Sequence, residues 1–166
     1  MELHGSSYLF ALATLDMTFI GFVTIVIAVR QNRGRGLSPF HILLTRFYME
    51  LALLSAGCAM FPPLLATWDM DAVWIWRLSN GVVVGAIWLV LWTYPKRRRA
   101  ALAEPLPPRV WLALFISSAC ALVCVASAIG LVAPGPGPVA LGATYLLFRA
   151  CRSFESDLFP MFFEKD

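Results

Sequence analysis

The sequence predicts an all-α integral membrane protein: a bundle of five, alternatively four, transmembrane helices forming one domain over residues 1–166. Hydrophobic residues make up 60% of the chain and charged residues 14%, with a mean hydropathy of +0.75, which is too apolar for a water-soluble domain. The apolar residues also fall into runs close to the roughly 20 residues that an α-helix needs to cross about 30 Å of hydrocarbon. This composition excludes disordered, disulfide-stapled secreted and nucleic-acid-binding proteins.

The first two predicted spans are bounded by basic residues and by prolines. The first covers 8–29 and ends at the arginines of a glycine-containing loop, 30–36. The second covers 40–64. Ser38 is a suitable N-cap for it, Pro39 suits its first helical position, and the pair Pro62 and Pro63 is expected to end it.

The next two predicted spans cover 72–94 and 110–132. We expect Pro95 to end the third span, and a basic cluster follows it directly: Lys96, Arg97, Arg98 and Arg99. The fourth span contains no ionisable side chain apart from Cys120 and Cys124, so it is the least ambiguous of the series.

The last segment, 139–159, leaves two interpretations open. As a fifth span it would carry Arg149 and Arg152 into the bilayer, at a cost of about 2.5 to 3.5 kcal/mol each on insertion scales. Otherwise it is an amphipathic helix on the membrane surface. We favour the fifth span, because apolar residues resume at Leu158 and Glu155 provides a counter-charge.

Orientation is predicted from the basic residues, because those near span ends stay on the cytoplasmic side. Eight of the thirteen Lys and Arg residues fall in the two loops 30–36 and 95–109. We therefore expect both loops in the cytoplasm and the N-terminus outside. With five spans, the C-terminus is cytoplasmic.

Seven strongly polar side chains fall inside the predicted spans, where uncompensated charge is costly and marks a partner, a cavity or an interface. They are Asp16, Arg46, Glu50, Arg77, Asn80, Arg149 and Arg152. A rise of about 1.5 Å per residue places Asp16, Arg77 and Asn80 roughly 8 to 12 Å below the outer surface, where they could meet.

The same estimate places Glu50 and Arg149 near mid-depth, and Arg46 and Arg152 in the inner half, which would allow a ladder between spans two and five. Arg46 and Glu50 are also four residues apart and can pair on one helix face. We favour a packing and orienting role for these groups. A polar conduit is the alternative.

Gly81 and Gly85 form a G-x-x-x-G pair, which lets another helix backbone approach closely in lipid. The pair predicts a helix contact, either within the bundle or across a dimer.

The sequence predicts no catalytic residue, metal site or cofactor. The four cysteines lack C-x-x-C spacing, and the histidines, His4 and His41, are expected on opposite sides of the membrane. The basic cluster from Lys96 to Arg99 predicts contact with anionic lipid headgroups.

Four short motifs carry a resemblance to a group of known proteins. LSPFH (37–41) opens the second span, FPPLL (61–65) closes it, WR (76–77) lies near the start of the third, and YPKRRR (94–99) follows it. In these motifs the chain resembles uncharacterised small multi-pass bacterial inner-membrane proteins. The resemblance implies the inner (plasma) membrane as location and implies no activity. The last segment of such proteins is often a plain apolar span, from which Arg149 and Arg152 depart.

We therefore expect a non-enzymatic accessory or interaction subunit of the membrane, partnered by a second copy or by another membrane protein. The alternative is a small transporter or channel lined by the charges of spans 1, 2, 3 and 5, with Glu50 as the gating or proton-accepting carboxylate.

Overall fold

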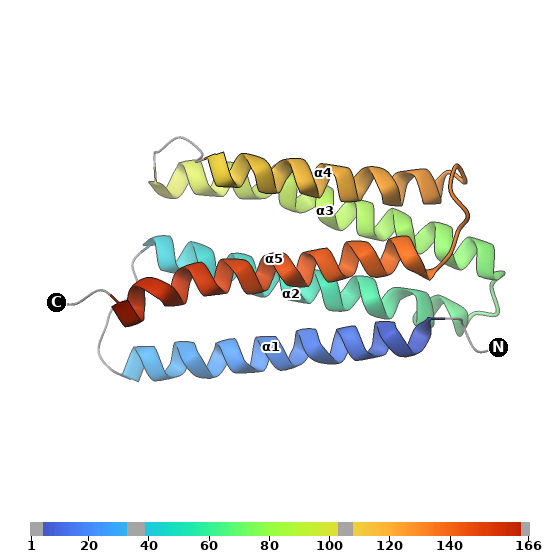
Figure 1. The fold of residues 1–166 in the computed structure, drawn as a ribbon. Helices are drawn as coiled ribbons and strands as arrows, with labels where there is room; N and C mark the ends of the chain where they lie inside the picture. The colour runs from blue at the N-terminus through green and yellow to red at the C-terminus, as the bar shows by residue number, and fades with distance from the viewer. Residues whose placement is uncertain (1–4, 33–38, 103–107, 164–166) are drawn as a thin grey trace.

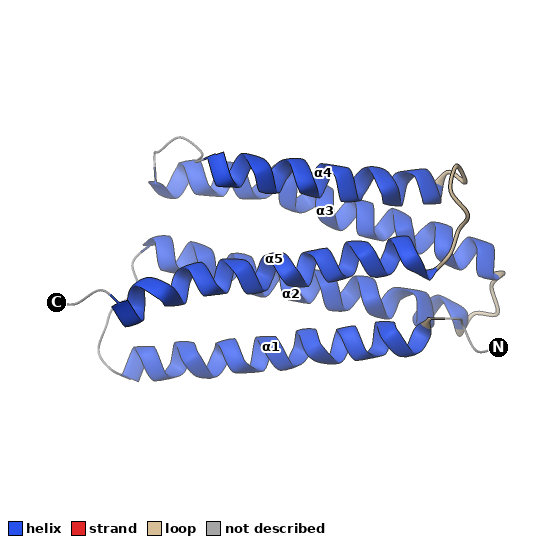
Figure 2. Ribbon diagram, in the orientation of Figure 1, coloured by secondary structure: helices blue, strands red, loops and turns tan. Residues whose placement is uncertain are grey.

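The chain folds as a bundle of five long helices joined up and down (Figures 1 and 2). The computed structural model describes the backbone of residues 5–32, 39–102 and 108–163, and the side chains of 5–29, 41–100, 108 and 110–156. The helices are α1 (Ser6–Asn32), α2 (Pro39–Ala66), α3 (Ala72–Leu102), α4 (Pro108–Ala128) and α5 (Pro136–Phe163). This confirms the predicted all-helical fold with five helices.

Four of the five helices are long and apolar enough to cross a membrane. The stretches that qualify are Ser6–Val29, His41–Ala66, Ala72–Ala100 and Val110–Ala128. The described residues of α5 contain no such stretch, and its Arg149, Arg152 and Glu155 are the physical reason. The chain therefore has the architecture of a multi-pass membrane protein with four evident spans.

The outer surface of the bundle is strongly apolar, as a lipid-facing surface must be. Large hydrophobic side chains on every spanning helix are exposed, among them Ile25, Leu64, Trp88 and Phe115, the last by 73%. In water an apolar surface of this extent would drive aggregation.

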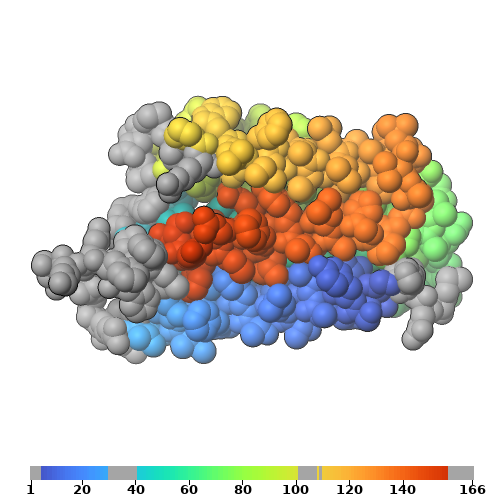
Figure 3. Space-filling view, in the orientation of Figure 1, coloured from blue at the N-terminus to red at the C-terminus, as the bar shows by residue number. Residues whose placement is uncertain are grey.

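Helices α2 and α5 form the centre of the bundle. Helix α1 packs on α2 and α5, whereas α3 and α4 pack on each other and on α5, and α3 also contacts α2. Helices α1, α5 and α4 together make up the face shown in Figure 3. The ends of α1, α3 and α5 and the beginnings of α2 and α4 lie at one end of the bundle (Figure 1).

Helix α5 is tied to its neighbours by polar side chains as well as by apolar packing. The buried Ser55 of α2 donates a hydrogen bond to the carbonyl oxygen of Ala143 over 2.9 Å. The hydroxyl of Tyr145 donates to the carbonyl oxygen of Ala113 on α4 over 3.0 Å. Helix α5, whose described residues contain no stretch apolar enough to span a membrane, is therefore an integral part of the bundle.

Three predicted helix ends are wrong. Helix α2 continues through Pro62 and Pro63 to Ala66, and α3 continues through Pro95 to Leu102. Each proline removes one backbone donor, and such a loss is tolerated inside a packed membrane bundle. Helix α4 ends earlier than the predicted 132, at Ala128, and is followed by Gly130 with a φ of +86°.

The orientation was predicted from two basic loops, and part of both lies outside the described residues. The loop 33–38, residues 103–107, and the side chains of Arg30 and Arg109 lie outside the described residues.

Candidate functional site

Glu50 is shared by two arginines from two helices. Its Oε1 lies 2.7 Å from Nε of Arg46 on the same helix, which is the pairing that their spacing predicts. Its Oε2 lies 2.6 Å from Nη1 of Arg97 on α3. The carboxylate of Glu50 therefore links α2 to α3, and the two arginines neutralise its charge.

The continuation of α3 past Pro95 explains why Arg97 reaches Glu50. Successive residues of a helix are rotated by about 100°, so four consecutive basic side chains cannot all point in the same direction. The side chain of Arg97 points towards α2 and contacts Glu50. Arg98 donates from Nη1 to the hydroxyl of Tyr94 over 3.3 Å, and the ammonium of Lys96 lies 3.8 Å from the ring centroid of Trp92. The sequence predicted lipid contact for all four basic residues and did not predict the contacts of Arg97 with Glu50 and of Arg98 with Tyr94.

We predict that the Glu50–Arg97 pair contributes about 1 kcal/mol of coupling energy, because both side chains remain more than a third exposed and are partly screened. The measurement is a double-mutant cycle of Glu50→Gln and Arg97→Gln, followed by unfolding in detergent. Arg152 and Glu155, a more exposed pair on one helix, serve as the control. Their coupling should be below about 0.5 kcal/mol, and equal coupling in the two cycles would contradict the linking role of Glu50.

Asn80 and Arg77 meet α4. Asn80, fully buried, donates from Nδ2 to the carbonyl oxygen of Trp76 (2.8 Å) and to Oγ of Ser127 on α4 (3.2 Å). Nη2 of Arg77 lies 2.7 Å from where a Cβ of Gly130 would be, so the guanidinium group lies against the C-terminal end of α4. A cation is favoured at that end of a helix dipole.

Asp16 does not join Asn80 and Arg77, although similar depth along the helix axes allowed it. Helix α1 makes no contact with α3 within the described residues. The carboxyl group of Asp16 is fully buried and lies beside Ser55 of α2. The single hydroxyl hydrogen of Ser55 is already donated to Ala143, and neither carboxyl oxygen of Asp16 has a hydrogen-bond partner in the described part of the chain.

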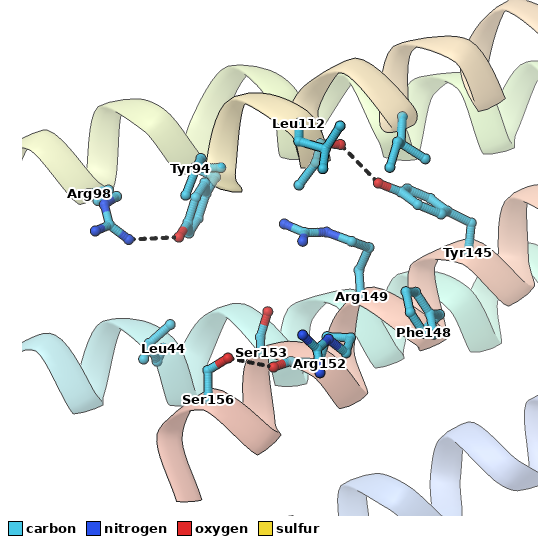
Figure 4. Close-up of a pocket in the computed structure, with 13 residues that line it drawn as sticks. Leu44, Tyr94, Arg98, Leu112, Tyr145, Phe148, Arg149, Arg152, Ser153 and Ser156 are labelled. Atoms are coloured by element: carbon cyan, nitrogen blue, oxygen red, sulfur yellow. Dashed lines mark hydrogen bonds between the residues drawn. The ribbon is translucent and has the colours of Figure 1, made fainter. Parts of the chain in front are cut away.

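Arg149 also differs from the expected ladder with Glu50. Its side chain reaches from α5 into a pocket of about 520 Å³ bordered by α2, α3, α4 and α5 (Figure 4). Arg152 lines the same pocket and pairs with Glu155. The predicted polar residues therefore form separate groups rather than one ladder.

The G-x-x-x-G pair faces away from the bundle. A Cβ added to Gly81 or Gly85 would meet nothing within 4 Å. Gly57 of α2 is equally open, and together with Gly85 it lines a groove of about 260 Å³ between α2 and α3. Within the monomer, the tight contact is made instead by Gly142 of α5, where a Cβ would lie 2.3 Å from Cγ1 of Val83.

Among the described residues, no three His, Cys, Asp or Glu side chains are grouped as a metal site would require. Comparisons with protein-family models, with curated proteins and with solved structures found no match. The geometry of the described residues is therefore that of a multi-pass membrane bundle with four polar clusters and an outward glycine face.

Proposed function

We propose that the chain is a non-enzymatic accessory or interaction subunit of the bacterial inner membrane, and that its contact surface is the glycine face of α2 and α3. The residues of this face are Gly57, Gly81 and Gly85. The observation that carries the proposal is the open space beside all three glycines. Within the described part of the chain, no helix uses the close approach that they permit.

A second copy of the chain is the occupant that fits this face best. Two-fold symmetry brings the same G-x-x-x-G pair of each α3 together, so one motif supplies both sides of the contact. The flanking Leu53, Val82 and Leu89 are apolar and line or border the groove. Contact between two such surfaces gains van der Waals packing, which is the main source of helix association in lipid.

We expect Gly81→Leu and Gly85→Leu together to weaken dimerisation by at least about tenfold, because the leucines hold the backbones apart. Oligomeric state is measured across a detergent dilution series. Gly21→Leu on α1 is the matched control, since a Cβ there also meets nothing within 4 Å.

An unchanged oligomeric state in the glycine variant would contradict the contact with a second copy. If a different membrane protein co-purifies with the wild type but not with the glycine variant, the glycine face contacts that protein and not a second copy of the chain.

The orientation and the lipid contacts belong to the same proposal. The exposed Lys96 and Arg99 and the exposed Trp92 lie near the end of α3. Aromatic and basic side chains at one level are typical of the headgroup region, where anionic lipids attract them. The proposal places this end, with the end of α5, on the cytoplasmic side.

Transport is the second candidate, and one observation favours it. Asp16 keeps a buried carboxyl group without a hydrogen-bond partner among the described residues, and intramembrane ionisable groups of this kind mark ion pathways. The neutralised Glu50 does not fit the proton-accepting role as well as Asp16 does.

A further inference from the structure

A pocket of about 520 Å³ opens between α4 and α5 near the end of α3. Its lining combines apolar side chains with arginines (Figure 4). The apolar lining residues are Leu44, Val110, Leu112, Ala113, Ile116 and Phe148. Leu112 is 62% and Phe148 is 58% exposed, so the mouth opens towards the surrounding lipid.

The basic residues that line the pocket are three arginines, Arg98, Arg149 and Arg152. No acidic side chain is among the described residues that line it. Arg152 already pairs with Glu155, and Arg98 donates to Tyr94. Among the described residues that line the pocket, the arginines are therefore the only charged side chains.

Arg149 is the central residue of the pocket. It is half-buried, and its guanidinium group has no ion pair or hydrogen bond to any described residue. Figure 4 shows it reaching from α5 towards α4, between Tyr94 and Tyr145. A cation at such a place in a membrane bundle is costly unless a partner neutralises it, and five N–H donors suit the oxygens of a phosphate or carboxylate group.

We propose that this pocket binds an anionic lipid, with the lipid phosphate held by Arg149, Arg98 and Arg152 and an acyl chain along the apolar wall. The exposed Trp111 of α4 lies one residue from Val110 and marks the headgroup level. A lateral mouth at this level admits a bilayer lipid directly. The shared chemistry, an oxyanion, would also suit a soluble phosphate, which lacks the apolar part that the wall fits. This site is independent of the glycine face.

The test is retention of phosphatidylglycerol by the purified protein, measured by native mass spectrometry during delipidation, with phosphatidylcholine as the neutral comparison. We expect Arg149→Gln to reduce phosphatidylglycerol binding by about tenfold, since it removes charge-assisted hydrogen bonds. Arg46→Gln is the matched control. It removes the same charge from an exposed side chain of α2 that does not line the pocket, and we expect it to bind within about twofold of the wild type.

A second variant, Val110→Trp, keeps every charge and fills the apolar part of the pocket, so it tests the site even if Arg149→Gln fails to fold. We expect it to lose phosphatidylglycerol as well. Equal retention in wild type and Arg149→Gln, or equal binding of the two lipids, would overturn the proposal. Displacement of the lipid by millimolar inorganic phosphate would overturn the proposal of a lipid ligand and would show that the pocket binds a soluble anion.

Discussion

Replacing Gly142 by alanine is expected to lower the free energy of unfolding by about 1 to 3 kcal/mol, the usual cost of overpacking a tight core. The new Cβ would lie 2.3 Å from Cγ1 of Val83 and 3.4 Å from Sγ of Cys124. Val83 is fully buried and β-branched, so it has few rotamers in which to move aside. The contact can be relieved only by separating α5 from α3.

The measurement is reversible unfolding in detergent micelles, followed by tryptophan fluorescence. Gly21→Ala is the control for helix propensity, because a Cβ at that position meets nothing within 4 Å. It is expected to be neutral or to stabilise by up to about 1 kcal/mol. The double variant Gly142→Ala/Val83→Ala should recover part of the loss, because the second change removes the obstructing methyl groups. Equal stability of Gly142→Ala and Gly21→Ala would refute the close packing of α5 on α3.

The glycines illustrate what the sequence could and could not predict. The G-x-x-x-G spacing of Gly81 and Gly85 predicts a helix contact, but spacing does not say whether the contact lies within the bundle or outside it. The described residues of the monomer do not cover this pair. Gly142 carries no motif and was not selected. Its neighbours on the buried face of α5, Val139, Ala143, Leu146 and Ala150, follow a spacing of three or four residues, and this is the signal that could have marked it.

The polar residues show the same limit. Counting residues along a helix gives depth in the membrane, which is why Asp16 and Asn80 were expected near one another. It does not give the direction in which a side chain points or the order of helices around the bundle. The pairing of Arg46 with Glu50 was predictable because it is local to one helix. The pairing of Glu50 with Arg97 depends on the packing of two helices and on the passage of α3 through Pro95.

Asp16→Asn is expected to raise the free energy of unfolding by about 1 to 3 kcal/mol. The gain arises because the substitution removes the cost of leaving a buried polar group without a partner. The carboxylate has no donor of its own, and the hydroxyl hydrogen of Ser55 is committed to Ala143. An asparagine amide brings two N–H donors, and the Oγ lone pairs of Ser55 are within reach of one of them.

Asn80→Asp is the matched control, since it makes the opposite exchange at another fully buried position. There the amide donates to the carbonyl oxygen of Trp76 and to Oγ of Ser127. A carboxylate would lose the bond to Trp76, and the bond to Ser127 would have to reverse its direction. We expect this variant to be less stable by about 1 to 3 kcal/mol. A loss of stability in Asp16→Asn would show that a donor reaches the Asp16 carboxyl group after all.

The same variant also separates the two candidate functions. Proteins retain a buried group that lowers their stability when that group contributes to function. If Asp16→Asn is more stable than the wild type, the carboxyl group is therefore expected to have a functional role. Proton flux into liposomes that contain wild type or Asp16→Asn tests that role. Flux that depends on Asp16 would establish transport, with the carboxyl group as the proton carrier between α1, α2 and α5. Absence of flux in both proteins would remove transport, and Asp16 would then be a polar contact that orients α1 against its two neighbours in the subunit.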